Sequence, residues 1–93
     1  MTFVVKYYPD VLSEDIPAIS PGMRARIRKA IETRLMYAPQ DYGEPLRKTL
    51  KGYWKLRVGD YRIVFKIREN IVQIIGIGHR KDIYERMFSR IDS

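Results

Sequence analysis

Residues 53–67 read YWKLRVGDYRIVFKI, two strand-like runs on either side of Gly59-Asp60. A glycine–aspartate pair between runs of β-branched and aromatic residues is typical of a two-residue hairpin loop. With that loop, Arg57 faces Arg62 on the neighbouring strand. Because side chains alternate between the two faces of a strand, one face of this hairpin becomes apolar and the other cationic.

The two faces of the hairpin differ in what they can contact. The apolar face is the expected core and comprises Trp54, Leu56, Val58, Tyr61, Ile63, Phe65 and Ile67. The opposite face carries four cations, Lys55, Arg57, Arg62 and Lys66. Like charges directly opposite one another destabilise a sheet. This face is therefore either neutralised by nearby acids such as Asp60, Glu69 or Glu85, as on many solvent-exposed sheet faces, or it faces an anionic ligand.

A third strand is predicted over residues 71–77, after a turn at Glu69-Asn70, and completes a meander. In a regular register, four of its side chains lie on the Arg62 face: Gln73, Ile75, Ile77 and His79. Arg80 follows at the end of the strand. A one-residue change in the length of the Glu69-Asn70 loop would invert these assignments, because the side-chain period of a strand is two.

The remaining elements flank this meander. The pattern predicts a strand over residues 2–8, helices over residues 10–18 and 21–37, a loop over residues 38–45 and a last helix over residues 82–91. Ser20 and Pro21 suit the cap and first position of the long amphipathic helix. The order β-α-α-β-β-β-α predicts an α+β fold with helices packed on one face of an antiparallel sheet. One domain is expected to span residues 1–93.

Composition excludes several classes of function. A chain of 93 residues makes one small domain. The absence of cysteine excludes a disulfide scaffold and a thiolate nucleophile, and a single histidine, His79, excludes a multi-histidine metal centre. No apolar run approaches the length of a membrane span, and the N-terminus lacks the layout of a signal peptide. We therefore expect a cytoplasmic protein without a membrane partner.

The excess positive charge lies in the second half of the chain. Residues 1–45 hold six basic and six acidic side chains, whereas residues 46–93 hold twelve basic and five acidic ones, which accounts for the net charge of +7. Such asymmetry indicates a polyanionic partner, which could be nucleic acid, an acidic protein segment or an anionic membrane. A merely soluble basic surface is the alternative.

Two segments give the chain a family resemblance. They are residues 50–65, LKGYWKLRVGDYRIVF, and residues 78–84, GHRKDIY. Together with the two preceding helices and Pro45-Leu46, they resemble the RelE/ParE superfamily of bacterial and archaeal type II toxins over nearly the whole chain. The resemblance implies a RelE/ParE-like toxin fold and a cognate antitoxin protein that covers the basic surface.

The resemblance implies one of two activities. RelE-like members are ribosome-dependent endoribonucleases that cut mRNA, and ParE-like members inhibit DNA gyrase. The sequence favours the nuclease, because the basic and aromatic residues of its pattern occur together here. A ParE-like gyrase inhibitor, or a catalytically degenerate toxin that acts by binding, is the alternative. A basic domain without a toxic role would need neither segment.

Carried over residue by residue, the nuclease pattern implies a set of site residues. The catalytic candidates are Lys55, Arg62, His79, Arg80 and Tyr84. The RNA-binding candidates are Lys51, Arg57, Lys66 and Lys81. This chain departs from the pattern upstream, where a second lysine often present before Lys55 is replaced by Tyr53 or Trp54.

The implied chemistry needs neither a metal nor a cofactor. The 2′-hydroxyl of RNA attacks the adjacent phosphorus, and the protein moves two protons and stabilises the phosphorane. Arg62 and Arg80 suit the phosphorane as bidentate cations. Lys55 is the preferred base, and His79 is the competing candidate because imidazoles titrate near neutral pH. Tyr84 is placed to stack on or orient a nucleobase.

Overall fold

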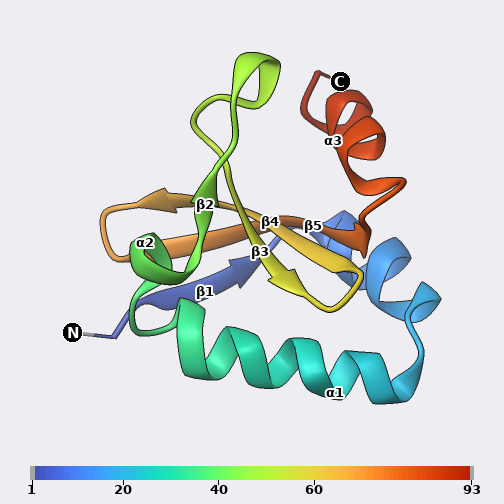
Figure 1. The fold of residues 1–93 in the computed structure, drawn as a ribbon, viewed down its shortest axis with the longest axis horizontal. Coiled ribbons are helices and arrows are strands. Elements are labelled where there is room, and N and C mark those ends of the chain that lie inside the picture. Colours follow the sequence, from blue (N-terminus) through green and yellow to red (C-terminus); the bar gives the residue numbers. More distant parts are fainter. Residues whose placement is uncertain (1, 93) are drawn as a thin grey trace.

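A five-stranded sheet forms the centre of the computed structural model, which describes residues 2–92 (Figure 1). The strands are β1 (Val4–Tyr7), β2 (Glu44–Pro45), β3 (Trp54–Val58), β4 (Tyr61–Arg68) and β5 (Ile71–His79). Their order across the sheet is β1-β5-β4-β3-β2. The first strand runs parallel to β5, and the other neighbours are antiparallel.

Helical segments precede and follow the strands. They are a π-helical segment Val11–Asp15, a 3-10 turn Ile16–Ala18, α1 (Pro21–Ala30) with its π-helical continuation Ile31–Leu35, α2 (Pro39–Tyr42), a 3-10 turn Lys48–Leu50 and α3 (Ile83–Asp92). The hydroxyl of Ser20 accepts a hydrogen bond from the Met23 amide at 3.4 Å, as expected of a cap. Within residues 2–92, no helix has the length and apolar character needed to cross a membrane.

Apolar side chains fill both sides of the sheet. Figure 1 shows α1 along one face and α3 over the other. The layer on the α1 side contains Leu56, Val58, Ile63, Phe65, Ile74 and Ile77. The smaller layer on the α3 side contains Leu50, Val64, Ile75, Ile83 and Met87. The hairpin's apolar face therefore packs against α1, as the sequence predicts.

The predicted α+β fold is confirmed, and three details differ from the expectation. The sheet is mixed rather than wholly antiparallel, because β1 pairs in parallel with β5. The helices do not share one face, because α3 packs on the side opposite α1. Residues 38–45 are not only a loop, since they form α2 and β2.

A bulge in β5 changes the register of the third strand. Phe65 pairs with Ile74, but the preceding residue Val64 pairs with Gly76, so Ile75 is the extra residue. An extra residue shifts the alternation of every side chain that follows it. This bulge explains why the C-terminal part of β5 differs from the regular pattern.

The prediction for the end of β5 was wrong in consequence. Gln73 and Ile75 lie on the Arg62 side, as expected, but Ile77 and His79 do not. Gly78 is the residue opposite Arg62, and His79 is opposite Tyr61.

Gly76 of β5 allows α3 to approach the sheet, because a Cβ atom there would overlap the Sδ and Cε atoms of Met87. Met87 is fully buried, so it has little room to move. We expect Gly76→Ala to lower the free energy of unfolding by about 1–3 kcal/mol in a urea titration. Gly22→Ala in α1 is the control, because nothing lies within 4 Å of a Cβ there. Equal losses for both variants would contradict the close packing of α3.

Candidate functional site

The hairpin β3–β4 places its cations in the register that the sequence predicts. Arg57 lies opposite Arg62, and Lys55 lies opposite Val64. The charge of Arg57 is partly compensated, because its Nε lies 3.6 Å from Oε1 of Glu44 on the neighbouring strand β2. Both side chains of this ion pair are exposed, so the pair contributes little to stability.

Arg62 is held in one orientation by the backbone of its own hairpin. Its side chain is buried, with 8% of the residue exposed. Nη1 donates hydrogen bonds to the carbonyl oxygens of Gly59 at 3.0 Å and Tyr61 at 2.9 Å. Both bonds use one nitrogen, and a guanidinium has five N–H donors. Arg62 is therefore a fixed cation, and no carboxylate among the described side chains of residues 2–91 forms an ion pair with it.

Lys55 and Tyr84 meet above the same face. The Lys55 Nζ lies 5.8 Å from the centroid of the Tyr84 ring, within the range of a cation–π contact. Tyr84 stands in the first turn of α3 and packs against the apolar layer beneath that helix. The docking of α3 thus brings an aromatic ring to the cations of the hairpin.

Arg80 lies beside the tip of the hairpin. Its amide donates to the Asp60 carbonyl at 2.8 Å, and its Nε lies 3.7 Å from the Asp60 Oδ1. The Arg80 side chain is 55% exposed, so its guanidinium can reach a ligand only by leaving a weak, solvated ion pair. The sequence left open which face Arg80 occupies, and the structure places it at the hairpin tip.

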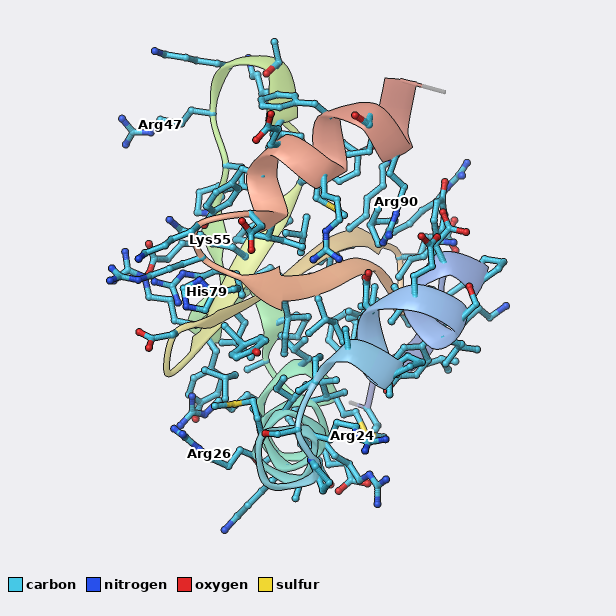
Figure 2. All side chains as sticks on the ribbon, turned by 90° about the vertical axis from the view of Figure 1, so that its right-hand side faces the viewer. Arg24, Arg26, Arg47, Lys55, His79 and Arg90 are labelled. Carbon is cyan, nitrogen blue, oxygen red and sulfur yellow. The ribbon has the colours of Figure 1, made fainter. Side chains whose placement is uncertain are left out.

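His79 lies on the α1 side of the sheet rather than on the Arg62 side. Its ring contacts Tyr61 edge to face, with the centroids 5.8 Å apart. Its Nδ1 accepts a hydrogen bond from the Lys81 amide at 3.2 Å, so in this arrangement Nδ1 carries no proton. Figure 2 shows Lys55 and His79 on one side of the molecule and Arg90 on the other.

The predicted RNA-binding lysines lie in three different parts of the fold. Lys66 lies further along β4, with its Nζ 5.2 Å from the centroid of the Tyr53 ring. Lys51 is exposed after the turn Lys48–Leu50, and Lys81 is exposed in the turn before α3. The structure therefore gathers Lys55, Arg57, Arg62 and Tyr84 into one cluster on the α3 side, which we call the hairpin cluster.

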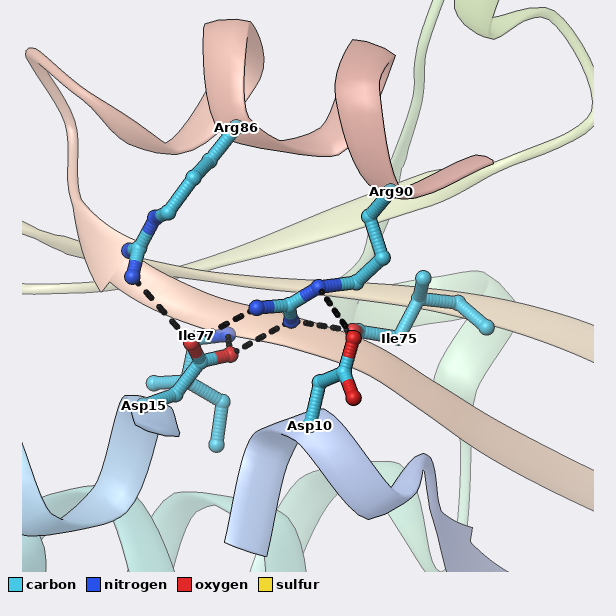
Figure 3. A network of polar contacts seen from close by, with 6 residues as sticks. All are labelled: Asp10, Asp15, Ile75, Ile77, Arg86 and Arg90. Atoms are coloured by element: carbon cyan, nitrogen blue, oxygen red, sulfur yellow. Dashed lines mark hydrogen bonds and ion pairs between the residues drawn. The ribbon is translucent and has the colours of Figure 1, made fainter. Parts of the chain in front are cut away.

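A buried ion network holds α3 in place, and it was not predicted from the sequence. Asp15 is 1% exposed, and its carboxylate accepts from Nη1 of Arg90 at 2.8 Å and from Nη1 of Arg86 at 3.1 Å (Figure 3). It also accepts from the Ile77 amide at 2.9 Å. Arg90 in turn donates to the Ile75 carbonyl. The hydrogen bonds to Asp15 raise the pKa of Arg90 above its ordinary value.

The ion network also supplies hydrogen-bond partners to the backbone of the bulged strand β5. Beyond Tyr8, β1 no longer pairs with β5, and the backbone groups of Ile75 and Ile77 bond to the side chains of Arg90 and Asp15 instead. Buried backbone groups need such partners. The network therefore positions α3, and through it Tyr84, relative to the hairpin cluster.

The hairpin cluster can bind a phosphate and hold it. It combines a fixed guanidinium, a lysine ammonium and an aromatic ring on one sheet face, with Glu44 as the acid beside Arg57. Guanidinium and ammonium groups donate to phosphate oxygens, and aromatic rings stack on unpaired bases. A nucleic acid strand matches this combination of groups.

Comparisons with known proteins show which family this chain resembles. The model of the family described as "ParE toxin of type II toxin-antitoxin system, parDE" matches residues 11–84. Toxin RelG of Mycobacterium tuberculosis is 32% identical over 74 residues, which cover 77% of this chain and 85% of RelG. Both alignments are long enough to take in the greater part of the sheet.

Solved structures share the fold. The toxin–antitoxin complex RelBE2 of Mycobacterium tuberculosis matches with a TM-score of 0.80 and 26% identity, covering 86% of this chain and 100% of that one. A mutant of the Escherichia coli toxin RelE in the free state matches with a TM-score of 0.74 and 18% identity over 98% and 99% of the two chains. The RelB–RelE antitoxin–toxin complex of Methanococcus jannaschii matches with a TM-score of 0.64 and 22% identity over 87% and 96%.

Proposed function

The chain belongs to the RelE/ParE superfamily of type II toxin–antitoxin toxins, and we propose that it is a ribosome-dependent endoribonuclease that cuts mRNA. The observation that carries this proposal is the pairing of Lys55 with Tyr84 next to the fixed guanidinium of Arg62. RNA transesterification needs a group that takes the 2′-hydroxyl proton and a fixed cation that stabilises the phosphorane, and Lys55 and Arg62 supply groups of these two kinds on one face.

In the proposed reaction, the 2′-hydroxyl of one nucleotide attacks the phosphorus that follows it. Lys55 in its neutral form takes the hydroxyl proton. The bond from phosphorus to the 5′-oxygen breaks, and that oxygen takes a proton from a water molecule as it leaves, while the proton held by Lys55 returns to solvent. The products are a 2′,3′-cyclic phosphate and a 5′-hydroxyl end. Arg62 stabilises the additional negative charge of the phosphorane, and the ring of Tyr84 orients a nucleobase.

We also propose a cognate antitoxin as the protein partner. The solved complexes RelBE2 and RelB–RelE each join a toxin of this fold to an antitoxin. In this chain the net charge of +7 favours an acidic or amphipathic antitoxin segment that lies across the helices and the sheet. Such a segment would cover the hairpin cluster and neutralise the toxin.

Inhibition of DNA gyrase is the second candidate, and one observation favours it. Two of the five catalytic candidates have partners of their own, because Arg80 is paired with Asp60 at the hairpin tip and the ring of His79 contacts Tyr61 on the α1 side of the sheet. A toxin that acts only by binding would tolerate this arrangement. In that case toxicity would persist without mRNA cuts.

Mapping of mRNA 5′ ends tests the proposal. The chain is expressed without an antitoxin, and primer extension is run on translated messages alongside Arg62→Ala and the control Arg24→Ala. We expect new ends inside reading frames for the parent and for Arg24→Ala, and none for Arg62→Ala. Circular dichroism of purified Arg62→Ala checks that the fold survives. Toxicity and filamentation without new ends would move the chain to the gyrase branch.

A further inference from the structure

The cations of the sheet continue along β4 beyond the hairpin cluster. On the α3 side of β4, three of the four side chains are cations: Arg62, Lys66 and Arg68. The fourth is Val64, and Lys55 of β3 lies opposite it. Two residues of a strand advance by about 6.8 Å, so the row spans roughly 20 Å. This step is comparable to the distance between consecutive phosphates of an extended polynucleotide.

The row contains the same pair of side chains twice. Lys55 Nζ lies over the ring of Tyr84 at 5.8 Å, and Lys66 Nζ lies over the ring of Tyr53 at 5.2 Å. Tyr53 and Tyr84 both pack against the apolar layer beneath α3. In each pair a half-buried ring therefore holds an ammonium group above the sheet face, where it is available to an anion.

A groove extends the row towards the first strand. Lys66 pairs with Gln73 of β5, which pairs with Lys6 of β1, so the three side chains form one line across the sheet. These residues line a groove together with Ile67, Arg68 and Ile71. Lys6, Lys66 and Arg68 are exposed, and in the part of the chain that the structure describes none of them has a salt-bridge partner.

We infer that this row and groove form a track for a single RNA strand, in which Lys66, Arg68 and Lys6 bind the phosphates that flank the scissile one. The inference rests on the proposed nuclease function and adds the path of the substrate to it. An RNA strand that is cut beside Lys55 must continue beyond the hairpin cluster. Along β4 it would meet Lys66 and Arg68, which form no salt bridge among the described side chains. An acidic peptide such as the proposed antitoxin segment would pair with the same cations, but only a nucleic acid also provides bases that stack on the rings of the two Lys–Tyr pairs.

The test measures the salt dependence of binding. The probe is a fluorescent 12-nucleotide RNA with 2′-O-methyl groups throughout, which cannot be cleaved by attack of its own 2′-hydroxyl. Each phosphate contact in a single strand contributes about 0.7 to the slope of log affinity against log salt. We expect Lys66→Ala to reduce that slope by about 0.7 and to weaken binding about fivefold at 0.1 M salt. Lys6→Ala and Arg68→Ala should behave alike.

The matched control is Lys29→Ala, an exposed lysine of α1 on the other side of the sheet. It removes the same charge and should leave the slope unchanged. Equal losses for Lys66→Ala and Lys29→Ala, or binding that is tighter to a duplex of the same length, would overturn the track. If the three track variants reduce the slope as expected but the chain cuts no mRNA, the nuclease proposal is refuted and the track stands. Cleavage that depends on Arg62, together with unchanged RNA binding by Lys66→Ala, would refute the track alone.

Discussion

Replacing Lys55 with methionine should lower the rate of mRNA cleavage by about 10²–10⁴, the range for a residue that transfers a proton in the transition state. Methionine keeps the length of the side chain and its packing near Tyr84, and it removes the ammonium group. The rate is measured in a single turnover on ribosomes programmed with a defined message.

Two further variants make this result specific. Lys29→Met removes an exposed charge from α1 and should cleave at the parent rate. His79→Gln tests the competing base, and its ring lies on the other side of the sheet against Tyr61. A larger loss for His79→Gln than for Lys55→Met would transfer the role of base to His79.

Replacing Asp15 with asparagine should destabilise the fold by about 3–5 kcal/mol, the usual cost of removing one partner from a buried ion pair. The side chain of Arg90 is 7% exposed and would lose its closest carboxylate, while the carboxylate of Asp10 remains 3.4 Å from its Nε. For a domain of this size, the loss corresponds to a fall in Tm of roughly 12–40 °C. Differential scanning calorimetry of the purified protein measures it.

Glu14→Gln is the control for this substitution. It removes an exposed carboxylate from the same helical segment, and surface changes of this kind stay within about 0.5 kcal/mol. A Tm for Asp15→Asn close to that of Glu14→Gln would show that the network is dispensable. Reduced cleavage by Asp15→Asn at temperatures where the variant is folded would show in addition that α3 positions Tyr84.

The hairpin could be predicted from sequence because its determinants are local. Gly59 has a φ of 60°, the conformation that a two-residue loop requires at its first position. The alternation around it then fixes the pairing of Arg57 with Arg62. By contrast, residues 71–77 are apolar at nearly every position, so no alternation reveals the bulge at Ile75.

Pairings between distant segments could not be predicted in this way. Nothing within residues 2–8 specifies a parallel partner, and the pairing of Val4 with Ile71 depends on the whole topology. The sequence did not predict which face of the sheet α3 covers. Val64 and Ile75 are apolar residues on an otherwise cationic face, and only the position of α3 shows that they belong to an apolar layer. In the site, Lys55 and Tyr84 are brought together only by that helix.

Asp15 has a consequence for the order in which the chain matures. Its two arginine partners lie 71 and 75 residues further along the chain. At about 5–20 residues per second, a ribosome takes roughly 4–15 s to add the last of them. Throughout that interval the nascent chain contains Asp15 but not yet both of the arginines that bond to its carboxylate in the folded protein. The sheet pairings need no residue beyond His79, but α3 gains its buried counter-charge, and Lys55 its neighbour Tyr84 on a docked helix, only after Arg86 and Arg90 have been made.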